Sequence, residues 1–475
     1  MSITQSMANA LSGLTAASRT AEVVSSNLAN ALTDGYGRRS IELTGQAYGG
    51  TSAGVQVVGI SRNVDVALLA DRRIADGALS SDRSMREAAS RLEDLMGDPA
   101  SGGHLANRIN DLEGAFRLAA SDPSSQLRLD GAADAIVNLA REFNRIEDGV
   151  QTIRLDAETS ISKQVERLNQ ALGAIETINA DIQRSGSNGL DVNALLDQRQ
   201  MLVDEVNEIV PVRELVRDNG RIALMSQTGA LLIDGKATRF EFDPVSTMTA
   251  DLSATNGTLD VLTMNGLPFE LPSDPPAGSL SAAFQVRDET TVSLQRSVDA
   301  AAAEVAARLT GAPASSPDAP GANDILLDGS GAVDLADLTG LAGRLSVNAK
   351  IVASSVVLRD GLDAIAPGAA GDARQLNGFA SALSSRSAIL PGTQADTAAG
   401  IATSLVSDIA SLRLAAERNE SLSAARADTL KAAELANGVD SDAELQQLLL
   451  VEQNYAANAR VIQTIDALIQ TLIEI

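Results

Sequence analysis

The sequence contains no cysteine and no tryptophan, and it has a single histidine among 475 residues. Without thiols, the chain forms no disulfide and no cysteine-ligated zinc or iron–sulfur centre. A Ser-His-Asp triad would have to use His104, which precedes a predicted helix and reads as an ordinary surface or cap residue. We therefore predict a protein that is not an enzyme and that holds no cofactor and no metal.

Aromatic residues make up 2% of the chain, and 62 acidic residues outnumber 37 basic ones, for a net charge of −25. Nucleic-acid-binding proteins need a basic surface and aromatic stacking, so we predict no nucleic-acid partner. No run of about 18 apolar residues occurs, which predicts no membrane insertion. The N-terminus lacks the pattern of a secretory signal, so any export would use a route without a cleaved signal peptide.

Both ends of the chain show the alternating three- and four-residue apolar spacing of a coiled-coil seam. The N-terminal seam residues are Ile3, Met7, Ala10, Leu14, Ala17, Ala21, Val24 and Leu28. The C-terminal seam residues are Leu448, Val451, Tyr455, Asn458, Ile462, Ile465, Ile469 and Leu472. We predict a terminal coiled coil of residues 1–34 and 440–475, its second helix opened by a capping box, Ser441 to Glu444. The alternative is two separate amphipathic helices packed on a core.

The alanine-containing N-terminal seam buries little apolar area for the number of residues that it must order. We therefore expect the two terminal helices to fray in the isolated chain and to become ordered through further partners.

Between the termini, the pattern predicts a mainly α-helical protein with a β-rich insert. Residues 35–210 and 279–439 show mostly helical spacing and form one predicted long-helix bundle domain, with a β-hairpin-like segment at 38–64. Within it, helix breaks are predicted at Gly97-Asp98-Pro99 and at Ser121-Asp122-Pro123. Residues 211–278 form the predicted small β domain. Its short apolar runs are separated by turn signals at Asp218-Asn219-Gly220, Thr228-Gly229 and Asp234-Gly235.

Two stretches later in the chain are interpreted as irregular. The Pro-, Ala- and Ser-rich segment 311–323 is a predicted linker. The acidic segment 324–337 does not fit a calcium-binding loop, because Ile325 and Leu327 occupy positions where that loop needs ligands. We interpret it as a turn.

Several motifs resemble those of one protein family. Residues 27–36, Asn-Leu-Ala-Asn-Ala-Leu-Thr-Asp-Gly-Tyr, resemble the N-terminal signature of bacterial flagellar axial proteins, the rod, hook and hook-associated proteins. Residues 453–466 look like the shared C-terminal motif of that family. In the middle of the chain, residues 120–125, 139–144 and 193–199 are similar to its hook-associated branch.

The resemblance implies a structural component of the flagellum at the junction between hook and filament, required for filament assembly. It implies an extracellular protein that assembles with itself into a junction ring. Its neighbours would be the flagellar hook protein and hook-associated protein 3, and a flagellar type III export chaperone would hold it beforehand. A hook or rod subunit of the same family is the alternative. A wall-degrading enzyme is disfavoured, because glycan-cleaving sites stack sugars on aromatic rings and this chain has no tryptophan and three tyrosines.

In this family the terminal helices lie in the inner core of the tubular axis, which gives a set of candidate assembly residues. They are Ile3, Met7, Leu14, Val24, Leu28, Asn30, Gly35, Tyr36, Leu448, Val451, Tyr455, Asn458, Ile462, Ile465, Ile469 and Leu472.

Overall fold

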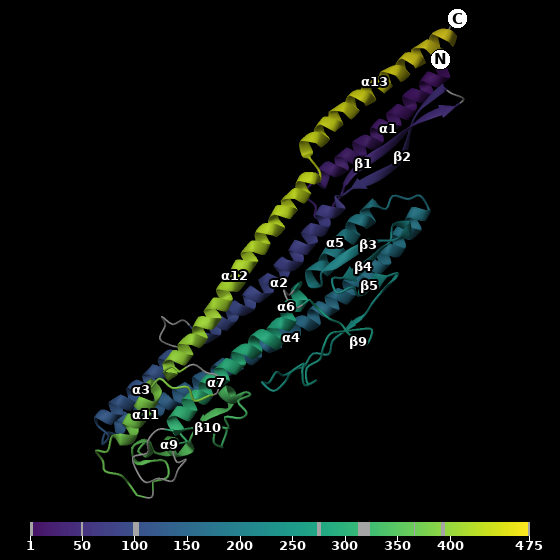
Figure 1. Cartoon of the computed structure of the whole chain (residues 1–475). Helices are drawn as coiled ribbons and strands as arrows, with labels where there is room; N and C mark the ends of the chain where they lie inside the picture. Colours follow the sequence, from purple (N-terminus) through teal and green to yellow (C-terminus); the bar gives the residue numbers. More distant parts are fainter. Residues whose placement is uncertain are drawn as a thin grey trace.

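The computed structural model describes residues 3–48, 51–97, 104–272, 277–311, 324–364, 366–390 and 395–473. The molecule is a long rod with both chain termini at the same end (Figure 1). It is mainly α-helical with a few small sheets, as the sequence predicts. The predicted linker lies, except for Gly311, outside the described residues, and so does part of the boundary near residue 275.

The two terminal helices lie side by side at one end of the rod, α1 (Ile3–Ala29) against α13 (Ser441–Ile473). The predicted hairpin also forms: β1 (Arg38–Tyr48) pairs antiparallel with β2 (Thr51–Asn63) and packs on α1. We call these four elements the terminal unit. The chain leaves it through α2 and returns to it through α12.

Long helices form the rest of the rod. α2 (Val66–Met96) lies along α12 (Ala398–Asn437), and α3 (Leu105–Ser121) packs on α4 (Gln126–Ser187). With 62 residues, α4 is about 93 Å long. α3 ends at Ser121 and α4 begins after Ser125, so the predicted break at Ser121-Asp122-Pro123 is confirmed. α5 (Asn193–Ile209) then folds back on α4.

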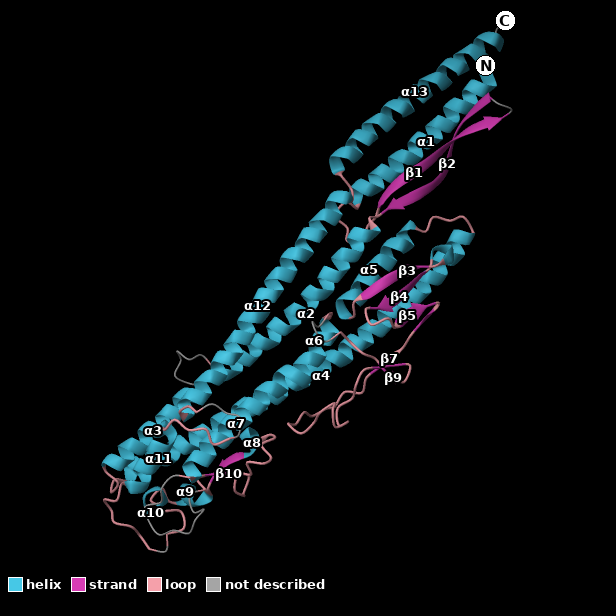
Figure 2. Cartoon of the chain, in the orientation of Figure 1, coloured by secondary structure: helices cyan, strands magenta, loops and turns pink. Residues whose placement is uncertain are grey.

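The β insert follows α5 and lies on the second half of α4 (Figure 2). Its larger sheet has the order β3-β4-β5-β6, formed by Val212–Val216, Ile222–Ser226, Leu231–Asp234 and Lys236–Ala237. A second sheet contains β7 (Phe240–Glu241), β8 (Thr263–Met264) and β9 (Leu267–Pro268). All three predicted turns join neighbouring strands of the larger sheet. They carry positive φ angles, at Asn219 (59°), Gly229 (91°) and Gly235 (86°).

After the insert, α6 (Ser279–Gln285) runs through a π-helical turn (Val286–Thr290) into α7 (Thr291–Thr310). The end of the rod far from the termini contains four short helices, α8 (Leu341–Arg344), α9 (Ala349–Ala353), α10 (Val357–Asp360) and α11 (Arg374–Ser384). It also holds one antiparallel pair, β10 (Leu326–Asp328) with β11 (Leu345–Val347). The sequence interpretation gave only a turn in this acidic segment, because three-residue strands are too short to show an alternating pattern.

Two apolar cores follow each other along α4. The distal core joins α3, the first half of α4, α7 and α11, and its rings Phe116 and Phe379 lie 5.1 Å apart. The proximal core joins the second half of α4 with α5 and the β insert, where Phe240 and Phe269 meet edge to face at 5.0 Å. α4 is therefore the element that connects both cores.

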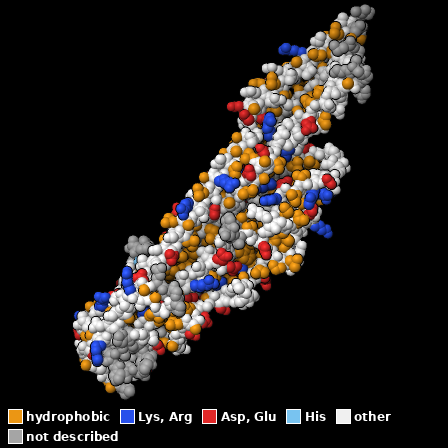
Figure 3. Space-filling view, viewed as in Figure 1, with side chains coloured by type: hydrophobic (Ala, Val, Ile, Leu, Met, Phe, Trp, Pro, Cys, Tyr) orange, Lys and Arg blue, Asp and Glu red, His pale blue; other side chains and the backbone are white. Residues whose placement is uncertain are grey.

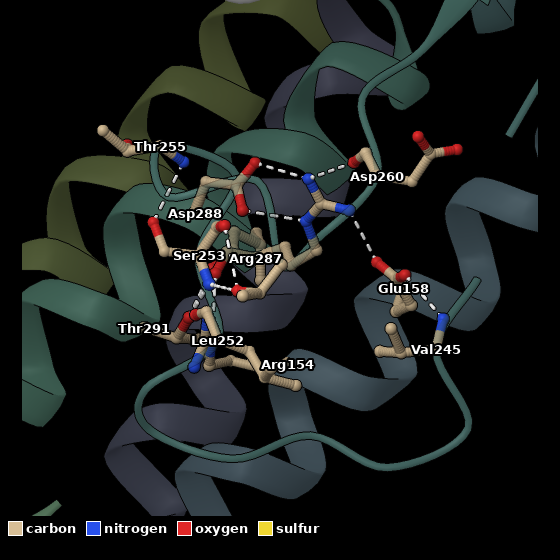
Figure 4. A network of polar contacts seen from close by, with 12 residues as sticks. Arg154, Glu158, Val245, Leu252, Ser253, Thr255, Asp260, Arg287, Asp288 and Thr291 are labelled. Atoms are coloured by element: carbon tan, nitrogen blue, oxygen red, sulfur yellow. Dashed lines mark hydrogen bonds and ion pairs between the residues drawn. The ribbon is translucent and has the colours of Figure 1, made fainter. Parts of the chain in front are cut away.

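Buried arginines attach the long loop between β7 and β8 to α4 and the π-helical turn (Figure 4). Arg287 and Glu158 have fully buried side chains and form an ion pair of 2.6 Å. The Glu158 carboxylate also accepts a hydrogen bond from the amide of Val245, at 3.0 Å. Arg154 donates to the carbonyl oxygen of Leu252 at 2.9 Å. These bonds give an otherwise irregular loop a fixed place against the helices.

His104 caps a helix, as expected of an isolated histidine. Its Nδ1 accepts a hydrogen bond of 3.1 Å from the amide of Ala106, at the start of α3. Among the described residues, no group of three or more histidine and carboxylate side chains is placed to hold a metal ion.

One described helical stretch is long and apolar enough to cross a membrane by length and composition alone. It is Ala398–Thr471, which covers α12 and most of α13, and its most apolar window has a mean hydropathy of 1.2. In this stretch Ala402, Leu405 and Ile409 belong to the distal core. The absence of membrane insertion stays a prediction.

Candidate assembly interface

The contact between α1 and α13 is close because small residues line α1. A Cβ atom on Gly13 would lie 2.8 Å from Nδ2 of Asn458, the polar member of the predicted C-terminal seam. The buried residues of α1 are Ala10, Ala16, Ala17, Thr20, Val23, Val24 and Asn27. Compared with the predicted seam, Thr20 and Asn27 are buried where Ala21 and Leu28 were expected. α1 is covered by α13 and by the hairpin, so its buried face is wider than that of a two-helix seam.

The candidate assembly residues divide into three groups by exposure. Buried are Val24, Val451 and Ile465. Exposed are Ile3, Met7, Leu28 and Tyr455. Half-buried are Leu14, Asn30, Gly35, Tyr36, Leu448, Asn458, Ile462 and Ile469. Leu472 lies in α13, but its side chain is outside the described part of the structure.

The hairpin is seated on α1 through a glycine. The hydroxyl of Ser12 accepts a hydrogen bond of 3.1 Å from the amide of Val55. Gly54 beside it has a φ of 101°, and a Cβ there would lie 2.1 Å from the Ser12 oxygen. Only glycine fits this backbone conformation at this distance.

Asn27 joins α1 to the start of the hairpin. Its side-chain amide donates to the carbonyl of Arg39 at 2.8 Å, and its oxygen accepts from the Arg39 amide at 3.0 Å. The same oxygen accepts from the hydroxyl of Tyr36 at 2.9 Å. Asn27 is 1% exposed, and its side chain satisfies three half-buried polar groups at once. It belongs to the 27–36 motif but was missing from the candidate residues, because a search for an apolar seam passes over a polar side chain.

Asp197 connects the terminal unit to the helical bundle. Its carboxylate accepts from the amide of Gly37 at 3.0 Å and pairs with Arg62 at 2.7 Å and Arg39 at 3.0 Å. Four residues earlier, Asn193 donates to the carbonyl of Ile60 in β2 at 2.9 Å. The 193–199 motif therefore holds both strands of the hairpin. Nothing in the sequence linked it to them across more than 130 residues.

The start of α13 differs from the predicted capping box. The carboxylate of Asp440, not Ser441, accepts from the amides of Asp442 and Ala443, at 2.9 and 3.1 Å. Glu444 does not reach back to the helix start. Its side chain, 1% exposed, pairs with Arg38 of β1 at 2.8 Å. The glutamate therefore anchors α13 to the hairpin.

Acidic residues of α2, α5 and α12 gather around Arg72, next to the terminal unit. Arg72 pairs with Asp76 and with Glu434, each at 2.6 Å. Burial raises the pKa of Asp76 and of Glu434, while Arg72 opposes the rise. Burial and the neighbouring Asp76 also raise the pKa of Glu208. Negative charge is therefore disfavoured at this joint between the three helices.

The outward face of α13 is apolar and uncovered. Among its described apolar residues, only Val451 and Ile465 are buried, whereas Leu449 is 60% and Leu450 55% exposed. Apolar side chains (orange) are also visible on the terminal unit in the space-filling view (Figure 3). Large exposed apolar side chains along one helix are typical of surfaces that bind another protein or a membrane.

Comparisons with known proteins find three family matches along the chain. Residues 89–322 match the family described as flagellar hook-associated protein FlgK helical domain. Residues 7–36 match flagella basal body rod protein, and residues 436–475 match flagellar basal body rod FlgEFG protein C-terminal. The two end matches are thus to rod families, and the middle match is to FlgK.

Curated proteins named flagellar hook-associated protein 1 are similar over about half of the chain. The protein of Salmonella typhimurium is 29% identical over 53% of this chain and 48% of its own length. The Escherichia coli protein is 27% identical over 53% and 48%, and that of Bacillus subtilis 23% over 44% and 43%. The matched part of the chain spans about half the length of these relatives.

A solved structure shares the fold. The flagellar hook junction protein FlgK from Burkholderia pseudomallei aligns with a TM-score of 0.60. The alignment covers 78% of this chain and 100% of that chain, at 13% sequence identity.

Proposed function

Because the chain belongs to the family of flagellar hook-associated protein 1, we propose that it is a structural part of the bacterial flagellum. In this proposal it forms the junction between hook and filament, and the filament does not assemble without it. The observation that carries the proposal is the combination of a FlgK-type helical domain with a terminal unit whose helices expose apolar faces. Heterologous contacts between such faces build open helical assemblies.

The proposal includes the partners and the location of the chain. Copies assemble into a ring, with the flagellar hook protein on one side and hook-associated protein 3 on the other. The chain is exported by the flagellar type III apparatus without a cleaved signal peptide, after an export chaperone has held it, and it acts outside the cell. It performs no catalysis. The apolar face of α13, uncovered in the single chain, supports such contacts.

A hook or rod subunit is the second candidate, favoured by the rod-family matches at both ends. Immunogold labelling of isolated flagella separates the two. A thin band at the tip of the hook supports the junction protein. Label along the whole hook or in the rod supports the alternative.

Filament formation tests the role of α13. Deleting residues 440–475 should leave hooks without filaments. Leu449→Glu, a single charge on the exposed face of α13, should have the same effect while the chain is still exported. Leu127→Glu is the matched control, because Leu127 is 81% exposed on α4, outside the terminal unit. Normal filaments on cells with the deletion, seen by electron microscopy, would refute the proposal.

A further inference from the structure

A cavity of about 440 Å³ opens where β2, α2, α5 and β3 meet, next to the terminal unit. Its apolar wall includes Leu69, Val203 and Val212, all buried. At the rim, Val66 is 71% and Ile74 46% exposed. The volume lies in the range of about 300–1,000 Å³ that ligand pockets occupy.

Four arginines line this cavity, against one carboxylate. They are Arg62, Arg73, Arg199 and Arg213, and the carboxylate is Glu214. Two further carboxylates contact these arginines, Asp197 at Arg62 and Asp204 at Arg73, so the cluster holds four cations to three carboxylates. The chain as a whole has 37 basic to 62 acidic residues, so the cavity is less acidic than the rest of the molecule.

Arg199 is a buried cation whose bonds go to neutral acceptors. It is 8% exposed, and its guanidinium donates to the side-chain oxygen of Asn179 at 3.0 Å and to the carbonyl of Gly220 at 2.7 Å. Burial lowers its pKa; Glu214 opposes this, and the neighbouring Arg62 and Arg73 add to it. The guanidinium keeps its proton at any physiological pH. A buried charge without an opposite charge in contact is costly, and a carboxylate brought to it removes part of that cost.

Arg73, which also lines the cavity, has an unused donor. It is 5% exposed, and its Nε and Nη1 pair with Asp204 at 2.6 Å and with Glu214 at 2.9 Å. Its Nη2 is buried and has no hydrogen-bond partner in the described part of the chain. Buried guanidinium nitrogens are nearly always bonded, so an acceptor brought to Arg73 would satisfy this one.

We propose that this cavity receives a carboxylate side chain, presented by an apolar segment of a second copy of this chain. The apolar rim accommodates the segment, and the arginines bind the carboxylate through charge-assisted hydrogen bonds. A second copy supplies this chemistry, because its acidic residues are in large excess. The cavity also adjoins the terminal unit, so the contact continues the assembly surface there. The choice of a second copy rests on the proposed function.

The first test places a photocrosslinking amino acid at Ile74 of the full chain, in cells that assemble flagella. A reference position is Leu449, on the uncovered face of α13. We expect the Ile74 adduct to join two copies of this chain, at a peptide that contains aspartate or glutamate. An adduct to another protein overturns the inference. Adducts from Leu449 but none from Ile74 overturn it while the proposed function stands. If neither position gives an adduct, both fall.

The second test reverses the charge at the rim. Arg213 and Arg239 are both exposed arginines of the β insert without an ion pair among the described residues, and only Arg213 lines the cavity. Arg213→Glu should lower the yield of the Ile74 adduct about tenfold, because like charges across an interface repel. Arg239→Glu, the matched control, should keep it. Equal yields from the two variants would contradict a role for the arginines.

Discussion

Single polar residues hold the terminal unit in place, and Asn27 is the strongest case. Asn27→Ala removes the side-chain partner of the Arg39 amide and of the Arg39 carbonyl, whereas the Tyr36 hydroxyl keeps its bond to the Ser26 hydroxyl at 3.3 Å. Each buried polar group left unpaired costs about 1–3 kcal/mol. We expect hydrogen exchange at the amides of β1 to show a loss of at least about 2 kcal/mol in protection. Asn30→Ala, a half-buried neighbour with one bond to its own helix, should cost less than about 1 kcal/mol. Equal losses would contradict the role of Asn27.

Residues of this kind are the part of the site that the sequence could not identify. Gly35 and Tyr36 were named as candidates, and Tyr36 does bond to Asn27. Asn27 and Asp197 lie within the 27–36 and 193–199 motifs but are not among the candidate residues, because a buried polar group has no periodicity and its partners lie on other elements. Their importance depends on which strands and helices meet, and that is a property of the folded chain.

Helices and turns were predictable as elements because their signals are local. The breaks near 97 and 122 and the three turns of the β insert follow from Gly, Pro, Asn and Asp at fixed offsets. The start of α13 was predicted less well. Ser441 and Glu444 match a capping box, but the carboxylate of Asp440 is the group that accepts hydrogen bonds from the first amides of α13. Glu444 is buried against Arg38 and forms an ion pair with it instead of capping the helix. A local sequence pattern therefore indicates that a helix begins here, but tertiary contacts determine which side chain caps it.

The joint between α2, α5 and α12 should respond to pH. The pKa values of Asp76, Glu208 and Glu434 are raised, so the folded joint binds their protons more tightly than the unfolded chain does. Its stability therefore increases as the pH falls from neutral through these raised values, and the gain is complete below the ordinary values near 4. We expect slower hydrogen exchange in α5, after correction for the intrinsic rate, at pH 5 than at pH 7.5.

Two variants isolate this effect. Glu208 has no ion pair among the described residues, so Glu208→Gln removes a disfavoured charge without cutting a contact. It should protect α5 at pH 7.5, and the difference from the original chain should shrink as the pH falls. Glu87 is an exposed glutamate on α2, so Glu87→Gln is the control and should leave the exchange rate of α5 unchanged at both pH values. Faster exchange in α5 at pH 5 would show that the ion pairs with Arg72 outweigh the burial of the carboxylates.

At the scale of the whole molecule, stability should fall from the cores toward the terminal unit. α4 passes through both apolar cores, whereas α13 packs on α1 and keeps two buried apolar side chains, Val451 and Ile465, among its described residues. In the dilute single chain, we expect the amides of α4 to exchange only through openings that cost several kcal/mol, and those of α1 and α13 through openings of about 1 kcal/mol or less. The amides of α4 serve as the internal control in the same sample. In the proposed function, assembly covers the apolar face of α13, so protection of both terminal helices should rise in isolated flagella. Strong protection of Ile3–Leu28 in the dilute chain would show that the hairpin and α13 suffice to order α1, and that order at this end does not wait for neighbouring subunits.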